Sequence, residues 1–215
     1  MSTKRLMDLA IVALSVAAIG ALGSALRRRV KAAEAAQEPS VRMVPDWRFY
    51  VSGHQVSIGK SNAREVIVEF GDFECPYCAR FSHVLDTVAA REAEGITLYF
   101  RHFPLPAHPY AHAAAIASEC AAEQGRFAEF YHLAYGGTEP LSVALAGEAT
   151  LLPDPSAYRA CVESRAVNER IAVDSLAAVR LGVTGTPGVL VGDTFIAGSP
   201  SATLLDSALR AQNWR

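Results

Sequence analysis

The stretch that decides the fold is residues 66–78, which read VIVEFGDFECPYC. Its first five residues are apolar or β-branched apart from Glu69, with the length and composition of a buried strand. Apolar residues then recur at helical spacing as far as position 88, which predicts a helix that begins at the cysteines. Gly95 ends this helix, and residues 96–103 predict a second strand. A strand, a helix and a strand in this order favour a right-handed crossover and a parallel strand pair.

The two cysteines, Cys75 and Cys78, fall at the predicted start of this helix. Two thiols with this spacing can close a disulfide within one helical turn. Free backbone N–H groups and the helix dipole stabilise a thiolate on Cys75, which makes it the nucleophile. Cys78 lies one turn further in and is expected to resolve mixed disulfides. Pro76 suits the first helical position, where its missing N–H is not needed.

Half of a zinc site is the alternative interpretation of this cysteine pair. Zinc needs four ligands, and the sequence has no second close Cys/Cys or Cys/His pair. His83, five residues from Cys78 on the same predicted helix, has no obvious companion. We therefore expect a redox pair that uses only its own thiols, with no metal and no cofactor.

The rest of the chain predicts a small α/β sheet interrupted by helices. From about residue 107 to 181 the pattern is Ala-rich and helical, broken by glycines and prolines. Strand signals return at residues 188–191 and 194–196, which Gly192-Asp193 joins as a tight hairpin. A last amphipathic helix is expected over about residues 201–212.

The amino-terminal segment predicts a membrane anchor. Residues 6–26 are mostly apolar or small, and a helix needs roughly 20 such residues to cross the hydrocarbon core. A cleaved signal peptide is the alternative, although residues 21–23 (ALG) form only a weak cleavage site. We expect a tail at 1–5, a linker at 27–48 and one folded domain at 49–215.

Composition limits the size and the partners of this protein. Its 215 residues allow one sizeable domain and an appendage, and are too few for two full domains. The net charge of −2 gives no sign of the clustered basic surface that nucleic-acid binding requires. We therefore expect no nucleic-acid partner.

A second motif strengthens the redox interpretation. Residues 182–187 read GVTGTP and directly precede a predicted strand, and a proline flanked by glycines suits a cis peptide bond. Together with residues 70–78, this motif resembles the DsbA family of the thioredoxin superfamily, over roughly residue 49 to the carboxy terminus. The resemblance implies a thioredoxin fold with an inserted helical domain. It also implies an enzyme that exchanges disulfides with protein substrates and is reset by a separate redox partner.

The resemblance assigns a substrate-binding surface. Pro187 would be the cis-proline that hydrogen-bonds extended substrate backbone, with Thr186 before it. Pro76 and Tyr77, between the thiols, belong to the same expected surface. The best-known oxidase of the family has His at the position of Tyr77, and a tyrosine carries no positive charge. We therefore expect a less acidic Cys75 and a milder oxidant.

Glu69 lies six residues before Cys75, where the family often has a buried acid beneath the disulfide. As a functional residue it would accept the proton of Cys78 during resolution. The alternative is a strand residue whose carboxylate reaches solvent.

The other two cysteines, Cys120 and Cys161, lie in the predicted helical insertion, where some DsbA-like proteins carry a second disulfide. We expect a structural bridge, with two buried free thiols as the alternative. Such a bridge and the thiol pair both favour an oxidising periplasmic or cell-surface location. The basic residues at 27–31 outnumber those before the anchor and favour a cytoplasmic domain, so the two signals conflict.

Two other functions compete with the disulfide oxidoreductase. DsbA-like glutathione-dependent transferases or isomerases generally lack the second active-site cysteine, so Cys78 argues against that class. A non-catalytic chaperone or binding module would not need an intact Cys-x-x-Cys beside a cis-proline. The sequence leaves the direction of electron flow open, because that depends on the redox potential and the resetting partner.

Overall fold

The computed structural model describes residues 20, 23–24, 39–52, 56–59, 63–91, 95–137, 141–142 and 153–212. The chain divides into two units, Met1–Glu38 and Pro39–Arg215. Only three residues of the first unit are described, so the predicted tail and nearly all of the predicted anchor lie outside the described residues. Within the described segments, no helix combines the length and the apolar character that a membrane span needs.

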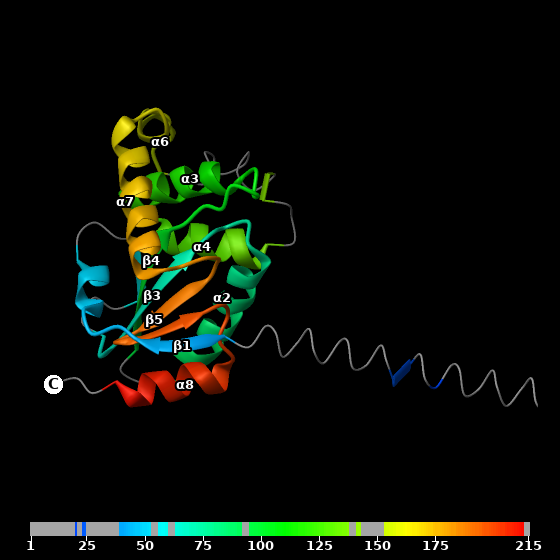
Figure 1. Ribbon diagram of the computed structural model, residues 1–215. Helices are drawn as coiled ribbons and strands as arrows, with labels where there is room; N and C mark the ends of the chain where they lie inside the picture. Colours follow the sequence, from blue (N-terminus) through cyan, green and yellow to red (C-terminus); the bar gives the residue numbers. More distant parts are fainter. Residues whose placement is uncertain are drawn as a thin grey trace, which may run out of the picture. The chain divides into compact units, whose positions relative to one another are not determined.

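A mixed β-sheet forms the centre of the second unit (Figure 1). The strands follow the order β1-β6-β5-β3-β4-β2, and every neighbouring pair is antiparallel except β3 and β4. The predicted parallel pair is therefore confirmed. The strand bounds are β1 Ser40–Met43, β2 Val56–Gly59, β3 Glu65–Gly71, β4 Ile96–His102, β5 Gly188–Val191 and β6 Thr194–Ala197.

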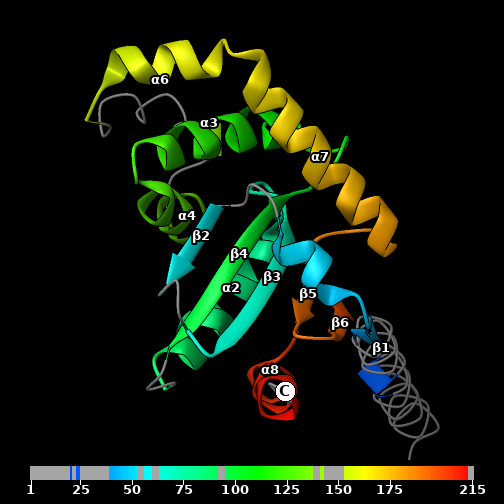
Figure 2. The same cartoon turned by 90° about the vertical axis from the view of Figure 1, so that its left-hand side faces the viewer.

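Helices cover both faces of this sheet. Figure 2 shows the 3-10 helix η1 in front of the strands and α2 behind them. The helix bounds are η1 Trp47–Val51, α2 Pro76–Ala89, α3 Ala111–Glu123, α4 Phe127–Gly136, α6 Pro155–Val162, α7 Arg165–Leu181 and α8 Ala202–Ala211. Three of the helices start at side-chain caps, in which Asp154, Ser164 and Ser201 accept backbone N–H groups.

Successive side chains of β3 point to opposite faces of the sheet, and the apolar core therefore has two layers, one on each face. Ile67 packs in one cluster with Phe81 of α2 and Leu205 of α8. Val68 and Phe70, which point the other way, join a second cluster that includes residues of η1 and α7. Glu69 therefore lies on the same face of the sheet as α2, which begins at the cysteines.

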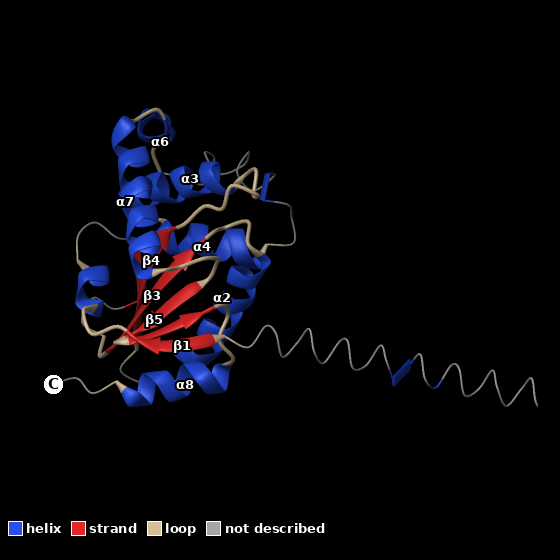
Figure 3. Cartoon of the chain, viewed as in Figure 1, coloured by secondary structure: helices blue, strands red, loops and turns tan. Residues whose placement is uncertain are grey.

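The helical insertion expected at about 107–181 contains α3, α4, α6 and α7, which gather at one end of the sheet (Figure 3). A disulfide joins Cys120 of α3 to Cys161 of α6, as expected. The thioredoxin fold with an inserted helical domain is thus confirmed.

The predicted linker at 27–48 extends too far along the chain. Its last residues belong to the folded unit, because β1 pairs along its whole length with β6. The guanidinium of Arg42 lies 4.5 Å from the centre of the Phe195 ring and donates to the Leu181 carbonyl. Trp47 is buried against the sheet. The strand was missed because no turn joins it to its partner β6, which lies far along the chain.

Candidate active site

The two candidate redox cysteines lie where β3 leads into α2. Cys75 caps the helix in an extended conformation, and Pro76 takes the first helical position, as predicted. The Cys75 N–H donates to the Asp72 carbonyl at 3.0 Å, and the Cys75 carbonyl accepts from the N–H groups of Cys78 and Ala79. Both thiols are free and buried. The backbone thus fixes both sulfur atoms at the first turn of α2.

The surroundings of Cys75 favour its thiolate form. Hydrogen bonding from Cys78 is the largest cause that lowers the pKa of Cys75 from 9.0 to about 5. Backbone N–H groups of Cys78 and Tyr77 lower it further, while burial acts in the opposite direction. Tyr77 in place of a histidine therefore does not leave Cys75 with the pKa of an ordinary thiol.

Cys78 has the opposite character. Burial, its hydrogen bond to Cys75 and the negative charges of Glu69 and Cys75 raise the pKa of Cys78 well above its usual value. Cys78 therefore stays protonated until a base accepts its proton, whereas Cys75 is ionised near neutral pH. The two thiols therefore differ in acidity as an attacking and a resolving thiol need to.

Glu69 is fully buried beneath the pair, so the alternative of a carboxylate reaching solvent is wrong. Burial raises the pKa of Glu69 to about 8, hydrogen bonds from Tyr131 and Cys78 limit the rise, and charge on Cys75 adds to it. A carboxyl group with this pKa exchanges protons near neutral pH, which suits a proton acceptor for Cys78.

Tyr131 is a site residue that sequence reasoning missed. Its hydroxyl donates to Glu69 Oε2 at 3.0 Å, and both side chains are buried. Tyr131 lies in α4, within the stretch that the sequence predicts only as helical. The contact spans 62 positions, so no local pattern could have revealed it.

The second predicted motif meets the first at Cys75. The Thr186–Pro187 peptide bond is cis, as predicted, and Cys75 Sγ lies 3.3 Å from the carbonyl oxygen of Thr186. Pro76 and Tyr77 are exposed on the same turn as Cys75, and 40% of the Tyr77 surface is accessible. Of the four candidate substrate-binding residues, Thr186 therefore contacts Cys75, while Pro76 and Tyr77 directly follow Cys75 in the chain. Pro187 is joined to Thr186 by the cis peptide bond.

Asp72 joins the turn before Cys75 to the proline-rich loop between β4 and α3. Its Oδ1 accepts the Glu74 N–H at 2.8 Å. Its Oδ2 accepts the Leu105 N–H at 2.8 Å and lies 2.7 Å from His108 Nδ1. Nothing in the sequence tied His108 to the chemistry of the cysteines, and the structure brings it to the turn before Cys75.

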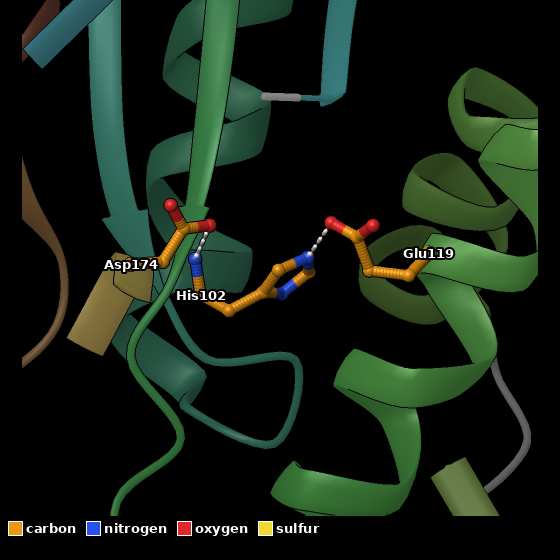
Figure 4. A group of neighbouring side chains, drawn as sticks. All are labelled: His102, Glu119 and Asp174. Atoms are coloured by element: carbon orange, nitrogen blue, oxygen red, sulfur yellow. Dashed lines mark hydrogen bonds and ion pairs between the residues drawn. The ribbon is translucent and has the colours of Figure 1, made fainter. Parts of the chain in front are cut away.

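A second buried polar cluster contains His102, Glu119 and Asp174 (Figure 4). His102 Nε2 lies 3.1 Å from Glu119 Oε1, and its backbone N–H donates to Asp174 at 3.0 Å. The guanidinium groups of Arg170 and Arg101 hydrogen-bond Glu119 and Asp174, respectively. Because these arginines already neutralise both carboxylates, the cluster fits an ion-pair network better than a cation site.

Comparisons with known proteins agree with this architecture. A family model described as Thioredoxin matches residues 51–211. The chain is similar to a thioredoxin-like oxidoreductase from Silicibacter pomeroyi (TM-score 0.68, 23% identity, 76% of this chain and 95% of that one). It is also similar to the thiol-disulfide exchange protein alpha-DsbA2 from Wolbachia pipientis (TM-score 0.66, 18% identity, 77% and 91%). Pseudomonas aeruginosa DsbA2 aligns with a TM-score of 0.57 and 24% identity over 73% and 93% of the chains.

Curated relatives with higher identity are much longer than this chain. Na(+)/H(+) antiporter NhaA 1 of Mycolicibacterium vanbaalenii is 35% identical over 160 residues, which cover 71% of this chain and 26% of that protein. NhaA of Herminiimonas arsenicoxydans is 33% identical over 157 residues, or 71% and 25%. The chain thus spans about a quarter of these relatives, and the transport activity in their names is not carried over to it.

Proposed function

The chain belongs to the thioredoxin family and has the fold of DsbA-like proteins, and on this premise we propose that it exchanges disulfides with protein substrates. The observation that carries the proposal is the contrast between the two thiols of one Cys-x-x-Cys. Cys75, with a pKa of about 5, lies against the cis-proline loop, and the protonated Cys78 lies above a buried acid. Neither a metal nor a cofactor enters this chemistry.

The first step is attack by the Cys75 thiolate on one sulfur of a substrate disulfide. A disulfide forms between Cys75 and that sulfur, and the other substrate sulfur leaves as a thiolate. The exposed Pro76 and Tyr77 and the loop at Thr186 and Pro187 would hold the substrate backbone beside the reacting sulfur. No electrons are lost or gained overall in this exchange.

The second step resolves the mixed disulfide through Cys78. Glu69 accepts the Cys78 proton, and the resulting thiolate attacks the Cys75 sulfur. The Cys75–Cys78 disulfide forms and the second substrate thiolate leaves, so the substrate has gained the two electrons that the pair has lost. The reverse sequence oxidises a substrate dithiol, and a separate thiol–disulfide partner returns the pair to its starting state.

We also propose that the folded domain faces an oxidising space outside the cytoplasm, anchored by residues 6–26. The Cys120–Cys161 bridge supports this, because structural disulfides persist where thiols are not kept reduced. The arginines at 27–29 argue for the opposite orientation. We expect a membrane-impermeant thiol reagent to label Cys120 and Cys161 in intact cells only after their disulfide has been reduced. Labelling only after lysis would place the domain in the cytoplasm.

Replacement of Cys78 by serine tests the proposed chemistry. The variant should accumulate mixed disulfides with substrate proteins through Cys75, because the resolving thiol is gone. The matched Cys75→Ser variant should trap none. Adducts that map to Cys120 or Cys161 would overturn the assignment, and an absence of adducts in both variants would refute the exchange activity.

A further inference from the structure

The low pKa of Cys75 raises a question about the charges around it. A positive charge next to a thiol favours the thiolate, yet residue 77 between the two cysteines is a tyrosine. The direct contacts of Cys75 are the Cys78 thiol, Thr186 and backbone N–H groups, none of which carries a full positive charge. These hydrogen bonds favour the thiolate without a cation, and a positive charge from elsewhere in the chain would act in the same direction.

The proline-rich loop between β4 and α3 brings a candidate to the start of α2. Asp72 accepts hydrogen bonds from Leu105 N and lies 2.7 Å from the imidazole of His108, while its own carbonyl accepts the Cys75 N–H. At the other end of the loop, the Tyr110 N–H donates to Glu74 Oε2 at 2.6 Å. The loop is therefore fastened on both sides to the turn that carries Cys75.

The charges on this turn favour a protonated His108. Burial lowers the pKa of His108, but the hydrogen bond and charge of Asp72 outweigh it and raise the pKa above 6.5, with smaller contributions from Cys75 and Glu74. These three acidic groups, Asp72, Cys75 and Glu74, act on the imidazole from the turn before α2. Electrostatic coupling is reciprocal, so an imidazolium that the Cys75 thiolate stabilises also stabilises that thiolate.

The Asp72 carboxylate increases the effect that the His108 imidazolium has on the Cys75 thiolate. Its side chain is wholly buried, and its negative charge beside the turn would oppose a thiolate at Cys75. The His108 side chain is only 24% exposed, which limits screening of its charge by solvent. The protonated imidazole neutralises Asp72 and also supplies the hydrogen bond that holds the loop.

We propose that His108, held by Asp72 at the start of α2, provides the positive charge that stabilises the Cys75 thiolate in place of a histidine between the cysteines. His108 is a positioning residue and does not react itself. The inference rests on the proposed function, because it assigns the control of the same thiol. It also makes the oxidising strength of the pair dependent on a group outside the motif.

The test measures the ionisation of Cys75 in a His108→Gln variant, by thiolate absorbance and by the rate of alkylation against pH. Cys78 is replaced by serine in every protein compared, so the absorbance and the alkylation rate both measure the ionisation of Cys75. We expect the ionisation constant of Cys75 to fall about threefold or more, in the range that a partly exposed charge interaction allows. The exposed His112, replaced by glutamine, is the matched control and should leave the constant unchanged.

A His108→Lys variant separates loss of charge from loss of the fold. It should retain more of the acidity of Cys75 than the glutamine variant, because the positive charge remains.

In proteins with both thiols, His108→Gln should also shift the equilibrium with glutathione toward the Cys75–Cys78 disulfide, because the reduced form loses stabilisation. If Cys75 ionises equally in the wild type and His108→Gln, with circular dichroism unchanged, the inference is wrong. Substrate trapping through Cys75 would then still stand, so the two failures are distinguishable.

Discussion

The buried carboxyl group of Glu69 makes a prediction about stability that can be worked out from the structure. Glu69 is replaced by glutamine, which keeps the size of the side chain and an oxygen that can accept the Tyr131 hydroxyl. Only the ionisation is removed. Any difference between the two proteins that varies with pH therefore reports the titration of Glu69.

The sign follows from the two pKa values. Burial raises the pKa of Glu69 to about 8 in the folded chain, against 4.5 for the ordinary group. Folding therefore favours the protonated acid, and its contribution to stability is complete below pH 4.5 and is lost as the pH rises to 8. The loss amounts to roughly 3 kcal/mol by pH 7, by linkage between the two states. Glu69→Gln escapes this loss and should be the more stable protein at neutral pH.

The assay is urea unfolding of both proteins at pH 5 and pH 8, with Cys75 and Cys78 reduced. The lowered pKa of Cys75 stabilises the folded state as pH rises. Both proteins share this effect, so only the coupling between the Glu69 and Cys75 charges remains in their difference. The advantage of the glutamine variant should grow by roughly 3 kcal/mol between the two pH values. An advantage that stays constant would show that Glu69 has an ordinary pKa, and the reasoning about its burial would fail.

Two further predictions concern contacts in the helical insertion. Tyr131→Phe removes the hydrogen bond from the tyrosine hydroxyl to the Glu69 carboxylate. A hydrogen bond to a charged group contributes about 1.5–3 kcal/mol. Because this bond favours the ionised carboxylate, its loss should raise the pKa of Glu69 by about one or two units. Resolution of mixed disulfides by Cys78 at pH 7 should then slow roughly tenfold and recover at higher pH. Tyr135→Phe is the control, since this hydroxyl lacks a hydrogen-bond partner among the described residues, and equal pH profiles for both variants would contradict the role of Tyr131. Replacing both Cys120 and Cys161 by alanine removes a cross-link between residues 41 positions apart. On the chain-entropy model, the free energy of unfolding should fall by about 4 kcal/mol. The reactivity of Cys75 should not change. Unaltered unfolding in urea would mean that the bridge does not stabilise the fold.

The sequence predicted those parts of the fold that have local signals. The strand before Cys75, the helix after it and the hairpin at residues 188–196 each contain their own periodicity or turn residues, and the structure has all of them. Edge strands β1 and β2 are as short as β5 and β6, but they were missed because no tight turn joins either one to its partner, which lies far along the chain.

The candidate site likewise contains some residues that a local sequence motif predicts and others that only the fold brings together. The cysteine pair and the cis-proline are short motifs that can be recognised one at a time. Tyr131 and His108 join the candidate site through contacts with Glu69 and Asp72 that span 62 and 36 positions. Such contacts depend on how α4 and the proline-rich loop fold back onto the sheet, which no local spacing encodes.

The central claim is that Cys75 is a thiolate nucleophile at neutral pH and Cys78 is not. Its most direct test is the rate of alkylation of the reduced protein as a function of pH, with the modified residue identified by peptide mapping. We expect modification of Cys75 with an inflection near pH 5 and no such inflection in Cys75→Ser. An inflection only near pH 9, or preferential modification of Cys78, would contradict it.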